Sequence, residues 1–339
     1  MRANVLLGLL AGVVALAAIG CQGDEGTGPG TTKETLTIAV VPKGTMHVFW
    51  KSVHAGAKQA EKELNADVAE GAPPKVKILW QGPVVEDDRA AQVNLVETFI
   101  QKRVDGIVLA PLDSKALVTP VRSAKTAGVP VVIIDSDLAD PEAYVSFVAT
   151  DNYKGGVLGA RRLAELLPDG GKVILLRYQV GSASTENREK GFLDEIAKFP
   201  KIQVISSDQY AGATVESAMN QAQAILTKYG EGQVDGIFCP NESSAYGMLR
   251  ALVESGRAGK IHYVGFDASD RLVEALEKGH IAGLVVQNPV RMGHDGVVTM
   301  VKHLRGEPVE KRIDTGVTLV TPENLPEPEI QILVHPSLE

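Results

Sequence analysis

Short apolar runs alternate with longer amphipathic stretches from Thr35 onward, and this alternation limits the fold more than any other feature of the chain. Four apolar runs come first: TLTIAVV (35–41), VKILWQG (76–82), DGIVLAP (105–111) and VPVVIID (129–135). Helical patterns lie between them, as at 49–64 and 89–103. Runs rich in Val, Ile and Leu that alternate with helices are typical of parallel strands buried on both faces. Right-handed crossovers then place helices on both sides of a sheet, which predicts a doubly wound α/β fold.

The same alternation resumes in the second half of the chain. Six further runs have the pattern of strands: YVSFVAT, GKVILLRY, IQVISS, DGIFCPN, YVGFDA and AGLVVQN. About a dozen strands are too many for one compact sheet of this kind, so we expect two lobes. The segments VDGIVLAP (104–111) and VDGIFCPN (234–241) share an opening and a proline near the end, which supports a weak internal repeat.

Composition excludes several classes of function. The formal net charge is −8, so the chain lacks the basic balance that a nucleic-acid or anionic-membrane surface requires. The seven histidines form no metal-binding pair or cluster, and no nucleophile stands in a recognisable elbow. Gly155, Gly156 and Gly159 lack the spacing of a dinucleotide loop, so close helix packing is the better interpretation. We therefore predict no metal, no cofactor and no enzyme, and we interpret Cys239 as a core residue.

The first 34 residues have the pattern of a secretion signal and a tether. Arg2 precedes an apolar run from Val5 to Ile19, and small residues lead to Cys21. The ending AIGC resembles a bacterial lipobox, which predicts cleavage before Cys21 and lipidation of that cysteine. The alternative is a signal cut nearby with an incidental cysteine. Residues 22–34 are rich in Gly, Thr and charge and predict a flexible tether.

Polar and aromatic side chains recur at one end of successive predicted strands. In open α/β sheets, ligands bind outside the carboxyl ends of the strands, so these side chains are predicted to face one crevice. Carboxylates accept hydrogen bonds from neighbouring hydroxyls, amides both donate and accept them, and aromatic faces cover C–H groups, which together suit a sugar. The candidates are Lys43, His47, Phe49, Trp50, Asp135, Ser136, Tyr210, Asn241, Asp267 and Gln287.

Each candidate also has an ordinary structural interpretation. Asp135 and Asp267 stand where an aspartate often caps the next helix. Phe49 and Trp50 are suited to the buried face of a helix, and Asn241 is suited to a turn. Their shared position at one end of the strands favours a binding site over these alternatives.

From about Leu36 to Val320 the chain resembles the ribose-binding branch of the periplasmic binding proteins, whose fold is shared with the lactose-repressor family. No single motif is specific, but their order and spacing are. The matching segments are TIAVV, FW at 49–50, VPVVIID, ATDNYKGG at 149–156, REKGF at 188–192, DGIF-PNE at 235–242, VGFD at 264–267 and Q-P at 287–289.

The resemblance implies a protein that closes two lobes of the periplasmic binding protein type I fold around a sugar. Phe49 and Trp50 would sandwich the ring, with Tyr210 approaching from the other lobe, while Asp135, Asn241, Asp267 and Gln287 would hold hydroxyls. Arg188 lies in the segment that carries a sugar-binding arginine in relatives, although alignment through Gly191-Phe192 puts that arginine on Glu186.

The resemblance also implies where the chain crosses between lobes, near 150–151, 287–288 and 316–317. The predicted division is a signal peptide (1–21), a tether (22–34), an N-terminal lobe (35–150 plus 288–316) and a C-terminal lobe (151–287 plus 317–339).

Three positions depart from the ribose pattern. Ser136 replaces an arginine, His47 replaces a turn asparagine, and Lys43 replaces a small polar residue. We therefore expect a different sugar or a sugar derivative.

The predicted function is an extracytoplasmic, lipid-anchored and monomeric solute-binding protein that delivers its ligand to the permease of an ABC importer. It would lie in the periplasm or at the cell surface. A receptor that feeds a chemosensor or sensor kinase, including one for a sugar-like signal molecule, is the alternative of the same structural class. A sugar-modifying enzyme is a further alternative. A regulator of the lactose-repressor type would need an amino-terminal helix-turn-helix, and signal and tether occupy that place instead.

Overall fold

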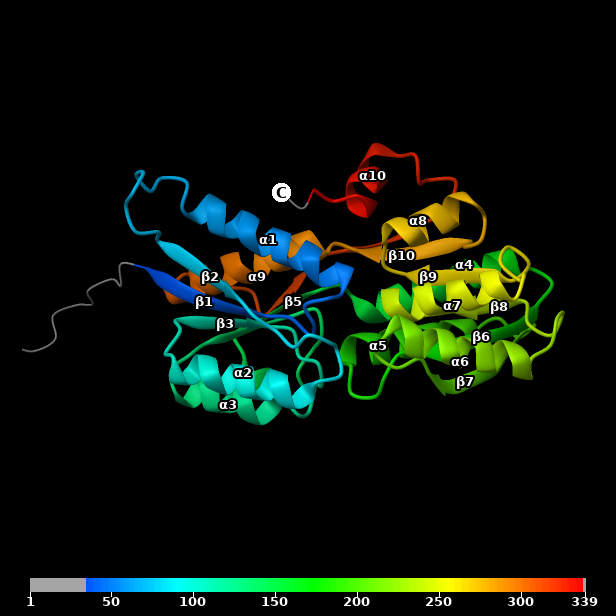
Figure 1. The fold of residues 1–339 in the computed structure, drawn as a ribbon, viewed down its shortest axis with the longest axis horizontal. Coiled ribbons are helices and arrows are strands. Elements are labelled where there is room, and N and C mark those ends of the chain that lie inside the picture. The colour runs from blue at the N-terminus through cyan, green and yellow to red at the C-terminus, as the bar shows by residue number, and fades with distance from the viewer. Residues whose placement is uncertain (1–34, 338–339) are drawn as a thin grey trace, which may run out of the picture. The chain divides into compact units, whose positions relative to one another are not determined.

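A computed structural model describes residues 35–337, so Cys21 and the predicted signal and tether lie outside the described residues. The described residues form two α/β lobes, each built on a six-stranded sheet (Figure 1). The N-terminal lobe has the strand order β11-β5-β4-β3-β1-β2, and all its pairings are parallel. Its strands are β1 (Leu36–Val41), β2 (Val76–Trp80), β3 (Gly106–Leu109), β4 (Val131–Ile134), β5 (Ser146–Ala149) and β11 (Arg312–Asp314).

The C-terminal lobe repeats this order as β12-β10-β9-β8-β6-β7. Its edge strand β12 pairs antiparallel with β10, which is the one departure from the all-parallel pairing that the sequence predicts for the described strands. Both β11 and β12 are short and were missed by the apolar pattern. The strands are β6 (Gly171–Arg177), β7 (Ile202–Tyr210), β8 (Gly236–Phe238), β9 (His262–Phe266), β10 (Gly283–Gln287) and β12 (Val317–Val320).

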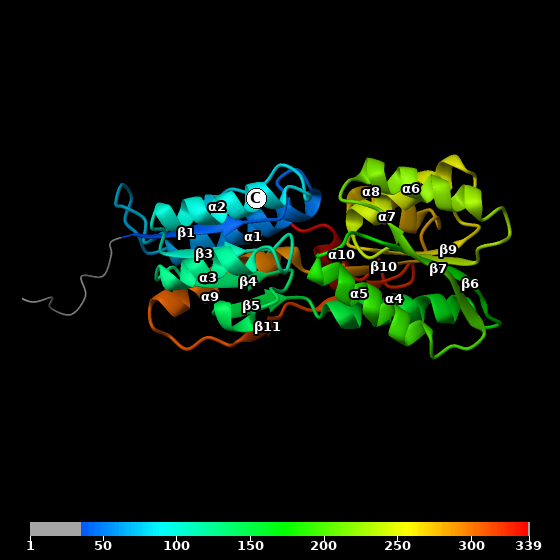
Figure 2. The same cartoon turned by 90° about the horizontal axis from the view of Figure 1, so that it is seen from below.

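Helices cover both faces of each sheet, as predicted (Figures 1 and 2). In the N-terminal lobe, α1 (Val48–Leu64) and α9 (Pro289–Leu304) bury one face, and α2 (Arg89–Gln101) and α3 (Val118–Thr126) bury the other. In the C-terminal lobe, α4 (Asn152–Leu166) and α5 (Ala183–Ile196) lie on one face. The opposite face packs against α6 (Val215–Lys228), α7 (Glu242–Glu254), α8 (Asp270–Glu277) and α10 (Pro328–Val334). The remaining helix is the short 3₁₀ turn η1 (Pro141–Ala143).

The repeated VDG segments occupy equivalent places in the two lobes. They lead into β3 and β8, and each of these strands is fourth in the order of its sheet. The carboxylate of Asp105 accepts a hydrogen bond from the backbone N–H of Thr37 at 2.7 Å, and that of Asp235 accepts one from Lys172 at the same distance. The shared aspartate therefore ties the start of a central strand to its neighbour in each lobe.

The glycines of α4 serve close packing, as the sequence predicts. A Cβ at Gly156 would lie 1.9 Å from the carbonyl oxygen of Arg188, and one at Gly191 would lie 2.1 Å from that of Tyr153. Side chains at these two positions would force α4 and α5 apart. The absence of a side chain at Gly156 thus determines how deeply Arg188 sits in the lobe.

Three connections join the lobes. One runs from β5 to α4, one from β10 to α9, and one from β11 to β12. The predicted crossing points fall within them, and their action as hinges stays a prediction.

No helix among residues 35–337 has the length and apolar character that crossing a membrane requires. Within the same residues, no three His, Cys, Asp or Glu side chains are grouped so that they could hold a metal ion. Cys239 is fully buried, and burial raises the pKa of its thiol to about 12.

Candidate ligand-binding site

A cavity of about 30 Å³, here called the central cavity, lies where strand ends of the two lobes meet. Nine of the eleven predicted ligand-binding residues line it. The full lining is Lys43, His47, Phe49, Trp50, Glu86, Asp135, Tyr178, Ser184, Thr185, Arg188, Asn241, Asp267 and Gln287. The expectation that side chains after successive strands face one crevice is here called the strand-end rule. The residues that it selected lie together in the fold, although some are more than two hundred residues apart in sequence.

Two buried aspartates face this cavity in unusual backbone conformations. Asp135 has φ 61° and Asp267 has φ 69°, and both values lie in the left-handed region that favours glycine. Such a conformation costs on the order of 1–3 kcal/mol and persists where surrounding structure enforces it, often at functional sites. Each lobe contributes one of these residues, directly after the strand β4 or β9.

The Asp135 carboxylate is paired with a cation of its own lobe. Lys43 Nζ lies 2.7 Å from Asp135 Oδ2, and both side chains are almost completely buried. The same ammonium donates a hydrogen bond to Ser184 Oγ at 3.1 Å, which reaches the first turn of α5 in the other lobe. The backbone N–H of Ser184 in turn donates to Ser136 Oγ at 3.1 Å. Ser136 thus joins the lobes instead of lining the cavity.

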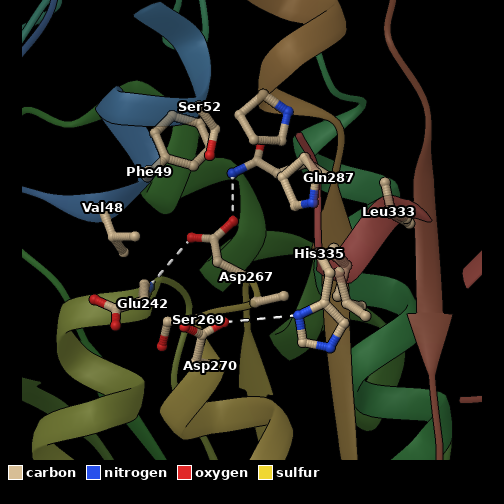
Figure 3. A pocket seen from close by; sticks show the side chains of 15 residues that line it. Val48, Phe49, Ser52, Glu242, Asp267, Ser269, Asp270, Gln287, Leu333 and His335 are labelled. Carbon is tan, nitrogen blue, oxygen red and sulfur yellow. Dashed lines mark hydrogen bonds and ion pairs between the residues drawn. The ribbon is translucent and has the colours of Figure 1, made fainter. Parts of the chain in front are cut away.

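The Asp267 carboxylate is held by neutral donors (Figure 3). Gln287 Nε2 donates to Asp267 Oδ1 at 2.7 Å, and the backbone N–H of Glu242 donates to Oδ2 at 3.2 Å. Burial raises the pKa of Asp267, although the nearby Arg188 charge acts in the opposite direction. The alternative that Asp267 caps the helix after it is wrong, because α8 has Ser269 at its cap and Asp267 contacts α7 instead.

Arg188 lies at the centre of the site, in spite of the alignment that favours Glu186. Its guanidinium donates to Asn152 Oδ1 at 2.8 Å, to the carbonyl oxygen of Pro240 at 2.9 Å and to Gln287 Oε1 at 3.1 Å. The guanidinium carbon stands 3.9 Å from the centre of the Phe266 ring. Burial lowers the pKa of Arg188, while Asp267 and Asp135 oppose that effect. Its Nη2 also lies 4.0 Å from Asp135 Oδ1 of the N-terminal lobe, so contacts from both lobes fix this residue.

His47 and Glu242 form an ion pair between the lobes. His47 Nε2 lies 2.9 Å from Glu242 Oε2. Burial alone would lower the pKa of His47, but the Glu242 contact and the charges of Glu86 and Asp267 raise it to about 9. At neutral pH the imidazole is consequently protonated. In its neutral form His47 also caps α1, because Nδ1 then accepts from the backbone N–H of Phe49 at 3.2 Å; protonation places a proton on both ring nitrogens and breaks that bond.

Phe49 and Trp50 both line the cavity, and Trp50 is also a core residue. Trp50 is 2% exposed and belongs to the apolar core of its lobe, as the structural alternative proposed, yet it also lines the cavity. Phe49 is partly buried, and its ring lies edge-on to the Trp50 ring with 4.9 Å between the two ring centroids. Asn241 likewise has both roles, since it faces the cavity and caps α7.

Tyr210 is not brought to the cavity. It is 42% exposed at the end of β7, with the Arg177 guanidinium 5.8 Å from its ring. The reason is topological, because β7 is the edge strand of its sheet and its end lies away from the central strands.

Glu86 and Tyr178 belong to the site and were missed. Glu86 Oε1 accepts from the Trp50 indole N–H at 2.6 Å, and its Oε2 accepts from the Tyr178 hydroxyl of the other lobe at 2.7 Å. Burial raises the pKa of Tyr178 well above its usual value. Tyr178 directly follows β6, so the strand-end rule applied to every strand would have found it, whereas Glu86 lies in the loop well beyond the end of β2. Ser184 and Thr185 lie in the first turn of α5 and offered no such signal.

Comparison with known proteins places this geometry in a family. Residues 38–308 match the model of the periplasmic binding protein domain. The D-ribose/D-allose-binding protein of Pseudomonas aeruginosa is 31% identical over 301 residues, which cover 86% of this chain and 90% of that protein. The ribose import binding protein of Bacillus subtilis is 32% identical and covers 70% of this chain and 75% of its own length.

Solved structures agree with the fold. The carbohydrate transporter solute-binding protein of Agrobacterium radiobacter, in complex with D-arabinose, has a TM-score of 0.82 and 34% identity, and the match covers 89% of this chain and 99% of that one. An ABC transporter solute-binding protein of Agrobacterium vitis with bound D-fucose has a TM-score of 0.80 and 37% identity, and the match covers 88% of this chain and 100% of that one. By its two parallel-sheet lobes and by this match across most of its length, the chain belongs to the periplasmic binding protein family.

Proposed function

We propose that this protein captures a sugar or sugar derivative in the central cavity and delivers it to the permease of an ABC importer. One observation carries the proposal: each lobe presents a buried aspartate in a left-handed conformation to the same cavity. Vicinal hydroxyls suit such carboxylates, because both oxygens accept hydrogen bonds. The relatives named for ribose and allose, and the structures with D-arabinose and D-fucose, support the sugar assignment.

The other lining residues support the same assignment. Arg188 donates, Asn241 and Gln287 both donate and accept, and Phe49 offers an apolar face for the C–H groups of a sugar ring. The charges already have partners within the protein, so the site is suited to binding, and we assign it no catalytic role.

A thermal-shift screen against a sugar panel tests the proposal. The panel contains D-ribose, D-allose, D-arabinose and D-fucose, with amino acids of similar size as the comparison set. A ligand that binds only the folded state raises the melting temperature, by an amount that grows with its concentration over Kd. We expect at least one sugar, and no amino acid, to raise it. A response to amino acids alone would overturn the sugar assignment.

Closure of the lobes on the ligand is part of the proposal. Direct contacts such as Tyr178–Glu86 and Ser184–Ser136 support a closed arrangement in the described structure. The three connections would act as hinges near 150–151, 287–288 and 316–317. Small-angle scattering with saturating sugar should give a smaller radius of gyration than scattering without it.

We further infer attachment to the membrane through lipidated Cys21, which lies outside the described residues. The protein would then act as a monomer in the periplasm or at the cell surface. Cys21→Ser should release it from the membrane fraction of cells, and unchanged membrane association of that variant would contradict lipidation at this cysteine.

A further inference from the structure

A second and larger pocket, here called the side pocket, adjoins the central cavity. Its volume is about 290 Å³. Three residues line both spaces: Phe49, Asp267 and Gln287. Figure 3 shows these side chains together with Glu242, which lines the side pocket only; Asp267 lies between Gln287 and Glu242, and the Phe49 ring lies beside them. The wall between the two spaces is therefore a single layer of side chains.

The chemistry of the side pocket differs from that of the central cavity. Apolar side chains form much of its lining, including Val48 on α1, Val286 on β10 and Leu333 on α10. Polar groups such as Ser52 and Asp270 complete it, and His335 Nδ1 stands 3.7 Å from Asp270 Oδ1. The central cavity, in contrast, is bounded mainly by charged groups and amides. Side by side, the two spaces suit a ligand with a polar end and an apolar end.

We propose that the side pocket binds the apolar substituent of a glycoside whose sugar ring occupies the central cavity. The inference rests on the proposed function. It names the ligand class as glycosides with an apolar aglycone. Ligand pockets typically enclose about 300–1,000 Å³, and the side pocket, at about 290 Å³, is close to the lower end of that range.

Both lobes and the C-terminal segment contribute to this pocket, so an aglycone there would contact the two lobes at once. Ser52 belongs to α1 of the N-terminal lobe, and Leu333 belongs to α10, which packs on the C-terminal lobe. The aglycone would thus stabilise the closed arrangement together with the sugar ring.

The test compares each free sugar of the panel with its methyl and phenyl glycosides in both anomeric forms, by calorimetry on the full chain. Burial of a phenyl group should tighten binding of one phenyl glycoside by about tenfold relative to the free sugar. Ser52→Phe reduces the volume of the side pocket from the N-terminal lobe, and Leu333→Trp reduces it from the C-terminal lobe. Each should weaken that glycoside by about tenfold or more and leave the free sugar within about twofold.

Exposed neighbours on the same helices serve as matched controls. Lys51→Phe on α1 and Ile332→Trp on α10 place the same ring outside the pocket, since Lys51 is exposed and Ile332 is 72% exposed. These variants should bind sugar and glycoside as the wild type does. Binding of a free sugar with rejection of every phenyl glycoside would overturn the inference and leave the proposed function intact. Equal weakening of sugar and glycoside by both pocket variants would also overturn it. No binding of any sugar or glycoside would overturn the proposed function itself.

Discussion

The two lobes place an aspartate at the same point of the same topology and then treat its charge in different ways. Asp135 follows β4 and Asp267 follows β9, and each of these strands is third in its sheet. Each aspartate has a positive φ, and each donates its backbone N–H to the neighbouring strand, at Val148 or Val285. In the N-terminal lobe the carboxylate meets Lys43 at 2.7 Å, whereas in the C-terminal lobe it meets only neutral donors within hydrogen-bond distance among the contacts described.

This difference assigns different tasks to the two halves of the site. A buried carboxylate beside an ammonium is already partly compensated, so a ligand hydroxyl adds less to it than to an uncompensated carboxylate. A buried carboxylate with neutral donors gains more from an additional hydrogen bond, because the charge is less well satisfied. We therefore expect Asp135 with Lys43 to contribute mainly to stability, and Asp267 to contribute mainly to affinity.

Removal of the cation is expected to have the largest effect. Lys43→Met would leave Arg188, at 4.0 Å, as the remaining cation beside the buried Asp135 carboxylate, and breaking a buried pair costs about 3–5 kcal/mol. Chemical denaturation should show a loss of that order in the free energy of unfolding. The double variant Lys43→Met with Asp135→Asn removes both charges and should recover much of the loss. A single variant as stable as the wild type would show that the pair contributes little.

Removal of the second carboxylate should affect binding instead. Asp267→Ala deletes charge-assisted hydrogen bonds worth on the order of 1.5–3 kcal/mol each, so affinity for the sugar should fall about ten- to a hundredfold or more. Asp267→Asn should lose less, because an amide still accepts one bond. Calorimetry beside melting temperatures separates the two effects. Full affinity with lowered stability in Asp267→Ala would make it a structural residue.

The sequence predicted that both aspartates belong to the site, but it did not predict that their carboxylates have different partners. The strand-end rule located Asp135, Asp267 and Gln287 because parallel strands present their carboxyl ends together. It could not show that Lys43 bends back to Asp135, since that contact depends on the path of the loop after β1. For the same reason Tyr210 was expected at the site, although an edge strand carries it away.

Glu86 and Arg188 show two further limits. Glu86 follows β2, which is also an edge strand, but the loop after it returns to the centre and reaches Trp50. Arg188 was ambiguous by alignment with relatives. Its spacing of four residues from Ser184 and from Phe192 puts all three on one buried face of α5, which was a usable signal.

The ion pair between the lobes predicts a dependence on pH. His47 titrates with a pKa of about 9 in this structure, above the ordinary value of 6.5. Its stabilising contribution is therefore complete below about pH 6.5 and is lost as the pH rises through 9. Between pH 7.5 and 9.5 the melting temperature of the wild type should fall more than that of His47→Gln. Glu189, whose pKa burial raises to about 7, titrates mostly below this window. Parallel curves for the two proteins would exclude His47 as the source.

The smallest effect on sugar affinity is expected from a change at Tyr210 of the C-terminal lobe, compared with the same change at Phe49 of the N-terminal lobe. Phe49 lines both pockets, so Phe49→Ala should remove ring contacts and weaken sugar binding by about tenfold. Tyr210 is 42% exposed on an edge strand and contacts Arg177, a pairing worth about 0.5–1 kcal/mol at an exposed site. Tyr210→Ala should then change stability slightly and leave sugar affinity within about twofold. If calorimetry instead gives Tyr210→Ala a loss close to that of Phe49→Ala, the end of β7 must move into the site when ligand binds.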